Sequence, residues 1–344
     1  MHPKAGNSNW DKQHPTACMT TTSLPLSSVK IDSQIAAAVS EGLLSRPKWL
    51  PSWLFYDEAG SRLFDQITEI PEYYVTRTER AILVQRAEEI VHRAAGDEAL
   101  RIVELGAGSC DKTRVLLRAA VARQDTVVYE PVDVSASALA EAQERIESEI
   151  PGVVVCPSVL DYFRDFSHEP PCPGERRLVL YIGSSIGNFE PHEARQLLEN
   201  VREGLSPGDA LLLGVDMVKD RDTLLRAYDD AAGVTAAFNR NILARINREL
   251  GADFDPYAFQ HRAVWNRYRS RIEMHLGSDL PQTVRIPALD LRLEFEAGET
   301  IHTENSYKYQ PGQAETMLRA SGFAPEQTWT DERGWFSVCL SRTE

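Results

Sequence analysis

The sequence predicts an α/β protein with a doubly wound parallel sheet and an inserted α+β domain. Strand-like and helix-like segments alternate between residues 100 and 215, and alternation at this spacing requires right-handed crossovers between parallel strands. The alternation stops after Asp216, where a long helical block and then period-two segments follow. The chain ends in two strand-like segments separated by Glu-Arg-Gly, which predicts a terminal hairpin. A sheet interrupted in this way indicates an inserted lid or substrate domain.

The composition limits the class of protein and its partners. A chain of 344 residues accommodates two domains, and 42% hydrophobic and 26% charged residues are typical of a soluble globular protein. The net charge of −14 argues against a nucleic-acid or anionic-membrane partner, because both require a basic surface. No run reaches the roughly 18 apolar residues of a membrane span. Residues 1–27 lack the apolar core of a signal peptide, and we expect them to form a disordered leader.

The cysteines and histidines indicate neither disulfides nor a metal site. The five cysteines are an odd number without Cys-x-x-Cys spacing, which favours a reducing, cytoplasmic setting. The eight histidines include no His-x-x-x-His pair, so we expect no metal. Cys110 is either a reactive thiol or, as we favour, a small residue packed beside a ligand.

Helical and aromatic segments precede the predicted sheet. We expect an amphipathic helix over 33–44, whereas the aromatic residues between Pro47 and Tyr56 are too irregularly spaced for a strand. Residues 57–68 predict a turn and a helix that Pro71 ends. Apolar residues on one side of 78–95 predict a further amphipathic helix.

The sheet and the inserted domain follow in order. The predicted parallel strands are 100–105, 126–134, 153–157, 177–182 and 210–215. The predicted helices between them are 112–122, 137–149 and 193–204. The later segments are a helical block over 222–250, antiparallel strands at 282–286 and 291–297, and a hairpin of 327–331 with 335–341.

A glycine turn at residues 102–112, Ile-Val-Glu-Leu-Gly-Ala-Gly-Ser-Cys-Asp-Lys, is the most informative motif. Gly106 and Gly108 let the backbone turn sharply and approach a ligand closely. The third glycine of the dinucleotide fingerprint is missing, and Lys112 stands where the next helix is expected to begin. This pattern favours a nucleoside cofactor without a pyrophosphate, such as S-adenosylmethionine, over NAD. The alternative is an ordinary strand-to-helix corner.

Other predicted strand ends also carry polar groups, and ligands of open α/β sheets bind at such ends. Glu130 and Asp133 end the second strand, where an acid can accept both ribose hydroxyls or merely cap a helix. Asp161 and Tyr162 follow the third strand, where they could meet an adenine amino group and ring. Asn188 follows the fourth strand, and its uncharged amide suits a substrate amine, although an asparagine after glycine is often a simple turn residue.

Two positions in the insertion could contact a substrate. The Tyr228 hydroxyl could orient an amine lone pair, although burial with a backbone partner is the commoner arrangement. Glu304 and Ser306 share one face of an extended segment, because strand side chains repeat every two residues. Together they could hold the two nitrogens of an imidazole, or they could be two polar residues on a solvated face.

Long motifs resemble one enzyme family. The stretch 56–79, Tyr-Asp-Glu-Ala-Gly-Ser-Arg-Leu-Phe-Asp-Gln-Ile-Thr-Glu-Ile-Pro-Glu-Tyr-Tyr-Val-Thr-Arg-Thr-Glu, closely resembles the signature of the histidine-specific N-alpha-methyltransferases of ergothioneine biosynthesis. Further resembling segments are 103–109, 183–189, 212–220, 227–239, 271–276 and 303–308. The resemblance runs from about residue 33 to the C-terminus, and motifs of this length in this order are highly specific.

The resemblance implies a Rossmann-like methyltransferase sheet that binds S-adenosylmethionine, with an inserted α+β substrate-binding domain. The implied division assigns 28–79 and 219–307 to substrate binding, and 80–218 and 308–344 to the cofactor domain. The implied cofactor-binding residues are Gly106, Lys112, Asp133, Asp161 and Tyr162. The residues implied to hold the amino-acid end of the substrate are Tyr56, Tyr73, Gly183, Asn188 and Tyr228, of which Asn188 and Tyr228 are the catalytic candidates. Those implied to surround the imidazole are Met274, Glu304 and Ser306.

The activity implied is trimethylation of the α-amino group of L-histidine, the first step of ergothioneine biosynthesis, by a cytoplasmic enzyme that we expect to be monomeric. The chain departs from the family pattern at Asn305, where a small apolar residue is expected, at Tyr162 in place of phenylalanine, and at Cys110 in place of serine. Two rival hypotheses are a same-family enzyme that acts on another aromatic amine such as tryptophan, and a catalytically silent cofactor-binding paralogue. A carboxylate at Glu304 argues against a neutral indole, which has a single donor.

Overall fold

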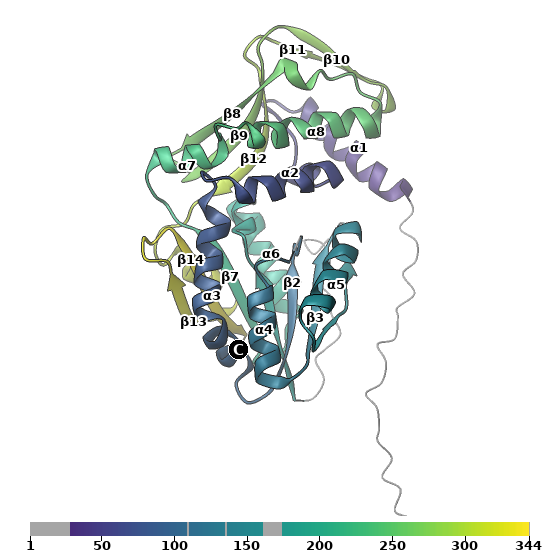
Figure 1. Cartoon of the computed structure of the whole chain (residues 1–344). Helices are drawn as coiled ribbons and strands as arrows, with labels where there is room; N and C mark the ends of the chain where they lie inside the picture. The colour runs from purple at the N-terminus through teal and green to yellow at the C-terminus, as the bar shows by residue number, and fades with distance from the viewer. Residues whose placement is uncertain (1–27, 109, 135, 161–173, 344) are drawn as a thin grey trace, which may run out of the picture.

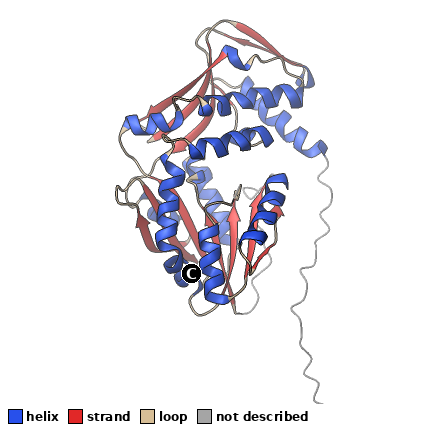
Figure 2. Cartoon of the chain, viewed as in Figure 1, coloured by secondary structure: helices blue, strands red, loops and turns tan. Residues whose placement is uncertain are grey.

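The structure is a computed structural model that describes residues 28–108, 110–134, 136–160 and 174–343. An eight-stranded sheet forms its larger unit (Figures 1 and 2). Its strands, in chain order, are β2 (Ala99–Leu105), β3 (Val127–Asp133), β4 (Val153–Val155), β5 (Ser158–Val159), β6 (Glu175–Tyr181), β7 (Ala210–Asp216), β13 (Phe323–Thr330) and β14 (Phe336–Thr343). Across the sheet the order is β13-β14-β7-β6-β2-β3-β4, and β5 also pairs with β3. All pairs from β7 to β4 are parallel, whereas β14 is antiparallel to both of its neighbours.

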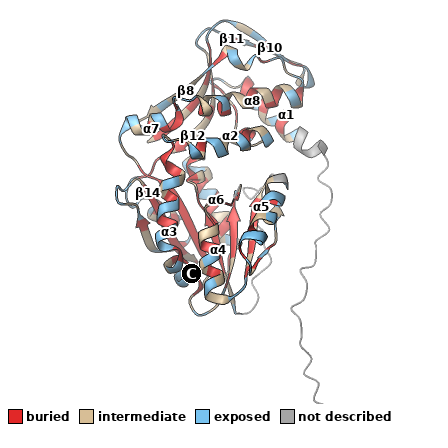
Figure 3. Cartoon of the chain, in the orientation of Figure 1, coloured by how far each residue is buried: buried red, intermediate tan, exposed pale blue. Residues whose placement is uncertain are grey.

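Helices cover both faces of this sheet, which confirms the doubly wound prediction (Figure 2). Buried side chains of α3 (Tyr74–Ala95), α4 (Arg114–Gln124) and α5 (Ala136–Glu149) pack in one core cluster with one face. Those of α6 (Pro191–Glu203) and α9 (Gln313–Ala320) pack with the other face. Because the central strands are buried on both faces, they consist of apolar runs, as in the fully buried β7 (Figure 3).

The chain order reverses at β2, whose two neighbours β3 and β6 lead to opposite edges of the sheet. The carboxyl ends of strands at such a reversal border the crevice where ligands of open α/β sheets bind. The smaller unit lies over these strand ends, at the top of Figure 1.

A four-stranded sheet forms the smaller unit, in the order β1-β12-β9-β8. Its strands are β1 (Lys48–Trp49), β8 (Phe259–Asn266), β9 (Arg271–Ser278) and β12 (Thr300–Tyr307). The helices of this unit are α1 (Ser28–Leu44), α2 (Glu58–Glu69), α7 (Arg221–Tyr228) and α8 (Val234–Leu250). A separate antiparallel ribbon of β10 (Gln282–Ile286) and β11 (Leu291–Phe295) extends it. No helix in the described ranges is long and apolar enough to cross a membrane.

Most predicted elements are present, and the differences have local causes. The expected helical block at 222–250 is two helices, because Asp229 to Gly233 form a turn in which Gly233 has φ +75°. The helix predicted from Lys112 begins at Arg114. Strands β8 and β9 were not predicted from the sequence. One face of β8 is exposed and carries Gln260, Arg262 and Val264, so β8 is not a continuous apolar run. The predicted leader, 1–27, lies outside the described residues.

Candidate functional site

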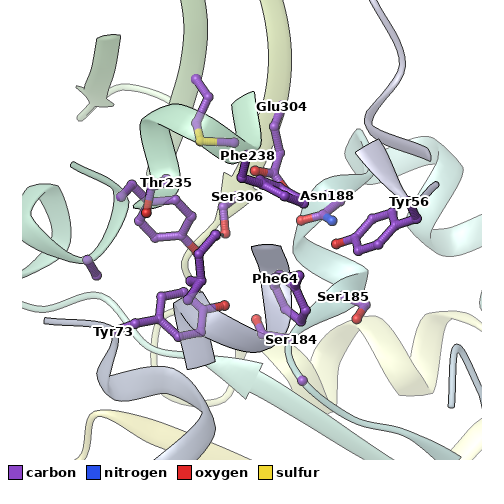
Figure 4. A pocket seen from close by; sticks show the side chains of 15 residues that line it. Tyr56, Phe64, Tyr73, Ser184, Ser185, Asn188, Thr235, Phe238, Glu304 and Ser306 are labelled. Carbon is purple, nitrogen blue, oxygen red and sulfur yellow. Dashed lines mark hydrogen bonds between the residues drawn. The ribbon is translucent and has the colours of Figure 1, made fainter. Parts of the chain in front are cut away.

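A pocket lies between the two units and is built from both of them (Figure 4). Its walls come from α2, the start of α3, the loop after β6, α7, α8, β9 and β12. The lining residues are Tyr56, Phe64, Ile67, Tyr73, Gly183, Ser184, Ser185, Asn188, Ala227, Tyr228, Thr235, Phe238, Met274, Glu304 and Ser306. All eight residues that the sequence assigned to the substrate are therefore brought together in one pocket. Their roles remain predictions.

Aromatic rings form the apolar wall of the pocket. Tyr56 meets Phe64 edge-on with ring centroids 5.8 Å apart, and Phe238 lies 5.9 Å from Tyr56. Tyr73 meets Tyr228 edge-on at 6.1 Å. Sequence reasoning did not single out Phe64 or Phe238, because their spacing on α2 and α8 resembles that of ordinary helix core residues.

The polar groups of the pocket converge on one space. Figure 4 shows the side chains of Glu304, Asn188 and Tyr56 directed toward one another. Asn188 ends a short 3-10 turn, Ser185–Asn188, in the loop that follows β6. Asn188 is therefore a turn residue, which was the alternative interpretation, and the same turn places its side chain in the pocket lining. Thr235 is 2% exposed, and its hydroxyl oxygen has no hydrogen-bond partner among the described residues.

Strand β12 presents Glu304 and Ser306 on the same face, as predicted. Its pairing with β9 shifts between His302 and Glu304, and beyond the shift Glu304 pairs with Met274. The intervening Asn305 is not in the pocket lining, and its amide donates to Glu190 Oε1 at 3.4 Å. The departure from the family pattern at Asn305 therefore lies away from the substrate side of the strand.

The carboxyl group of Glu304 has no hydrogen-bond or ion-pair partner among the residues that the structure describes. Burial raises its pKa from 4.5 to about 8, although the charge of Lys308 acts in the opposite direction. Burial also raises the pKa values of Tyr73 and Tyr228 well above 10. These two hydroxyls are therefore neutral at physiological pH, and they can orient a substrate group but not remove its proton.

The glycine turn after β2 is joined to the end of β3. The Gly106 N–H donates to the Val132 carbonyl at 2.8 Å, and the Gly108 N–H donates to Asp133 Oδ2 at 3.1 Å. Gly106 and Gly108 have φ values of +68° and +49°, a conformation that disfavours other residues. A Cβ atom at Gly108 would meet nothing within 4 Å, so the turn borders open space beside the Asp133 carboxylate.

Glu79 connects this turn to the loop after β6. It is fully buried on α3, accepts the Gly183 N–H at 2.8 Å, and pairs with Lys112 Nζ at 2.5 Å. A Cβ atom at Gly183, which has φ +83°, would lie 3.0 Å from Lys112 Nζ. Gly183 lines the pocket, and Lys112, a predicted cofactor residue, lies next to it. Asp161 and Tyr162, the other predicted cofactor residues, lie outside the described residues.

A buried polar cluster supports the glycine turn from below. Glu104 of β2 accepts hydrogen bonds from Thr113 Oγ1, at 2.6 Å, and from the Tyr129 hydroxyl. Burial raises the pKa of Glu104 to about 7 and raises that of the Cys110 thiol, whose sulfur lies 3.0 Å from the Tyr129 oxygen. Cys110 is thus a packed thiol with a low tendency to ionise.

The chain is similar to known proteins over nearly its whole length. A family model described as histidine-specific methyltransferase, SAM-dependent, matches residues 35–343. The histidine N-alpha-methyltransferase of Mycolicibacterium smegmatis is 47% identical over 303 residues, which cover 88% of this chain and 93% of that protein. The Mycobacterium tuberculosis protein of the same name is 46% identical with the same coverage. Ergothioneine biosynthesis protein 1 of Neurospora crassa is 30% identical over 86% of this chain, which spans 34% of that protein.

Replacement of Asp133 tests the cofactor side of the site. We expect Asp133→Ala to weaken S-adenosylmethionine binding by roughly 1.5–3 kcal/mol, the scale of hydrogen bonds to a charged group, as measured by calorimetry. Asp133→Asn is the control, because its amide oxygen can still accept the Gly108 N–H while the charge is lost. If Asp133→Ala binds S-adenosylmethionine as tightly as the parent, Asp133 is not part of the cofactor site. If Asp133→Asn alone retains the affinity of the parent, Asp133 acts only by accepting the Gly108 N–H and so stabilising the turn.

Replacement of Glu304 tests its raised pKa through stability. Between pH 4.5 and about 8 the folded protein retains this proton while the unfolded chain has lost it, so stability falls as the pH rises through this window. We expect Glu304→Gln to raise the free energy of unfolding by on the order of 1–3 kcal/mol at pH 8, and by much less at pH 5. Urea unfolding at both pH values measures this, with Glu296→Gln, at an exposed position, as the control. An equal gain in the free energy of unfolding at both pH values would show that the pKa of Glu304 is not raised.

Proposed function

This chain belongs to the family of histidine-specific, S-adenosylmethionine-dependent methyltransferases, and we propose that it trimethylates the α-amino nitrogen of L-histidine. The product would be Nα,Nα,Nα-trimethyl-L-histidine (hercynine), and the reaction would begin ergothioneine biosynthesis. The observation that carries the proposal is the placement of an unpartnered carboxyl group, Glu304, beside the Ser306 hydroxyl in an aromatic pocket. A neutral imidazole has one N–H donor and one bare nitrogen, and this pair of side chains complements it.

The same pocket also suits an amino group. Asn188, in the turn that follows β6, and Tyr228, at the end of α7, offer uncharged donors and acceptors for it. A carboxylate at this position would favour the ammonium form of the substrate, which has no lone pair. Neutral partners instead hold the amine while leaving its lone pair free to react.

The residues at the strand ends fit S-adenosylmethionine. The backbone at Gly108 is open to a ligand, and Asp133 beside it would accept the ribose hydroxyls. Lys112 lies next to Gly183 of the pocket lining. When bound, S-adenosylmethionine supplies an electrophilic sulfonium methyl group. Each transfer places one methyl group on nitrogen in exchange for one proton, so three cycles convert an ammonium group to a trimethylammonium group of the same charge.

We assign residues 28–79 and 219–307 to a substrate-binding domain, and 80–218 and 308–344 to a cofactor-binding domain. The two sheets support this division, since the four-stranded sheet lies within the first set and the eight-stranded sheet within the second. The first boundary falls inside the continuous helix α3, so the two domains share one rigid element. A shared helix keeps Tyr73 and Glu79 at fixed positions relative to each other.

Substitution of Tyr228 tests alignment of the amine. We expect Tyr228→Phe to lower histidine turnover more than cofactor affinity and to release mono- and dimethylated products, because each cycle requires the amine to be oriented again. Mass spectrometry of the products and calorimetry of cofactor binding measure the two effects. Tyr309→Phe, at a buried tyrosine outside the pocket lining, is the matched control. Trimethylated product at the parent rate from Tyr228→Phe would show that the hydroxyl has no catalytic part.

Substitution of Glu304 tests the substrate. The ring N–H favours the carboxylate form of Glu304 when histidine is bound. Loss of this hydrogen bond to a charged group should reduce kcat/KM for histidine by about 100-fold. The enlarged, neutral pocket of Glu304→Ala should begin to accept tryptophan, whereas Glu304→Gln, which retains the volume, should not. Methyl transfer to both amino acids by the parent and the two variants measures this. A parent that prefers tryptophan would overturn the histidine assignment, and a parent that methylates neither would favour a silent paralogue.

A further inference from the structure

A buried ammonium group lies directly behind the pocket. Lys308 follows β12, is 1% exposed, and is not in the pocket lining. Its Nζ lies 2.8 Å from Asp216 Oδ2, 2.9 Å from the Tyr228 hydroxyl and 2.8 Å from Ser306 Oγ. It therefore contacts both the hydroxyl proposed to orient the amine, Tyr228, and the neighbouring hydroxyl proposed to contact the ring, Ser306.

The backbone around Lys308 fixes it at the junction of the two sheets. The Lys308 N–H donates to the Ser270 carbonyl at 2.8 Å. The N–H of the next residue, Tyr309, donates to the Asp216 carbonyl at 2.9 Å, and its carbonyl accepts the Val218 N–H at 3.0 Å. Because these hydrogen bonds fix the backbone and the side chain is buried, the Lys308 ammonium group has little freedom to reach other partners.

The count of protons at this junction restricts the two hydroxyls. An ammonium group has three N–H donors and no acceptor, so Tyr228 and Ser306 each accept one hydrogen bond from Lys308, and Asp216 accepts the third. The Tyr228 and Ser306 oxygens are 2.7 Å apart, and one hydroxyl proton lies between them. One hydroxyl proton is then left for the pocket. If Ser306 directs its proton into the pocket, Ser306 is a donor to the substrate and Tyr228 presents a lone pair as an acceptor. In the reverse arrangement Tyr228 is the donor and Ser306 the acceptor.

We propose that Lys308 is a positioning residue that makes Tyr228 and Ser306 present opposite hydrogen-bonding characters to the substrate. The inference rests on the proposed function. Glu304 accepts the N–H of the imidazole, which leaves the other ring nitrogen bare, and Ser306 donates to that nitrogen. Tyr228 is then the acceptor of the pair and takes an N–H of the amine in the first two cycles, while the amine still has one, so the amine lone pair stays free. Recognition of the ring and alignment of the amine are thereby coupled through one proton.

A second buried lysine provides a matched control. Lys219 also pairs with Asp216, and its Nζ lies 2.7 Å from the Tyr74 hydroxyl and 2.6 Å from the Met217 carbonyl oxygen. Within the described part of the chain, Lys219 contacts no hydroxyl of the pocket lining. Replacement of either lysine by methionine leaves Asp216 paired with the other one, so neither variant leaves a buried charge alone.

The test is a double-mutant cycle in the full-length protein. Histidine turnover and product distribution are measured by mass spectrometry for the parent, Lys308→Met, Lys219→Met, Tyr228→Phe and the double variant Lys308→Met/Tyr228→Phe. We expect Lys308→Met to reduce kcat/KM by about tenfold or more and to release partly methylated product, whereas Lys219→Met stays within about threefold of the parent. In the Tyr228→Phe background, Lys308→Met should cost less than about threefold, because its main partner is already gone.

The outcomes separate the two proposals. A parent that does not methylate histidine overturns the proposed function and this inference together. A parent that does, combined with an equal cost of Lys308→Met in both backgrounds or with equal damage from Lys219→Met, overturns the positioning role alone. Should Lys308→Met fail to fold, as judged by thermal unfolding, the cycle of Ser306→Ala with Tyr228→Phe decides. If one proton couples the two hydroxyls as proposed, Ser306→Ala releases partly methylated product and its effect is non-additive with that of Tyr228→Phe. Additive effects would overturn the positioning role.

Discussion

The carboxylate of Asp216, at the end of β7, binds two buried ammonium groups, and one of them connects the two sheets. Lys308 reaches it from the end of β12 and Lys219 from the chain just beyond β7, while the Tyr74 hydroxyl of α3 donates to it at 2.7 Å. Burial alone would raise the pKa of Asp216, but the charges of Lys308 and Lys219 hold it below its usual value. The contact with Lys308 also reaches the pocket, because the same ammonium group binds the Tyr228 and Ser306 hydroxyls of its lining.

The buried acids near the site differ in whether the protein satisfies them. Glu79 is paired with Lys112 and a backbone N–H, and Glu104 accepts two hydroxyl hydrogen bonds. Glu304 has no such partner among the described residues, and burial raises its pKa. An acid without a donor is costly in a folded protein unless a ligand completes it. This contrast supports the assignment of Glu304 to substrate recognition, and it could not be inferred from residue types alone.

The sequence predicted the parallel sheet because fully buried strands are apolar runs, and it predicted the glycine turn because few residues tolerate its backbone angles. The period of two placed Glu304 and Ser306 on one face of β12 correctly. Lys308, Phe238 and Thr235 were not predicted, because their importance arises from contacts between segments far apart in the chain. One example is the contact of Lys308 with Tyr228, across 80 residues. Local patterns contain no information on such pairs.

The distribution of charge around the pocket fits the proposed triple methylation of one nitrogen. The acid lies at the end assigned to the ring, whereas a buried cation lies behind the tyrosine assigned to the amine. A cation one hydroxyl away disfavours an ammonium group more than a neutral amine. The number of N–H groups on the amine falls with each methyl group added, so hydrogen bonds alone hold it less firmly in each cycle. The ring contacts are unchanged throughout, and they can keep the nitrogen in place until its last lone pair has reacted.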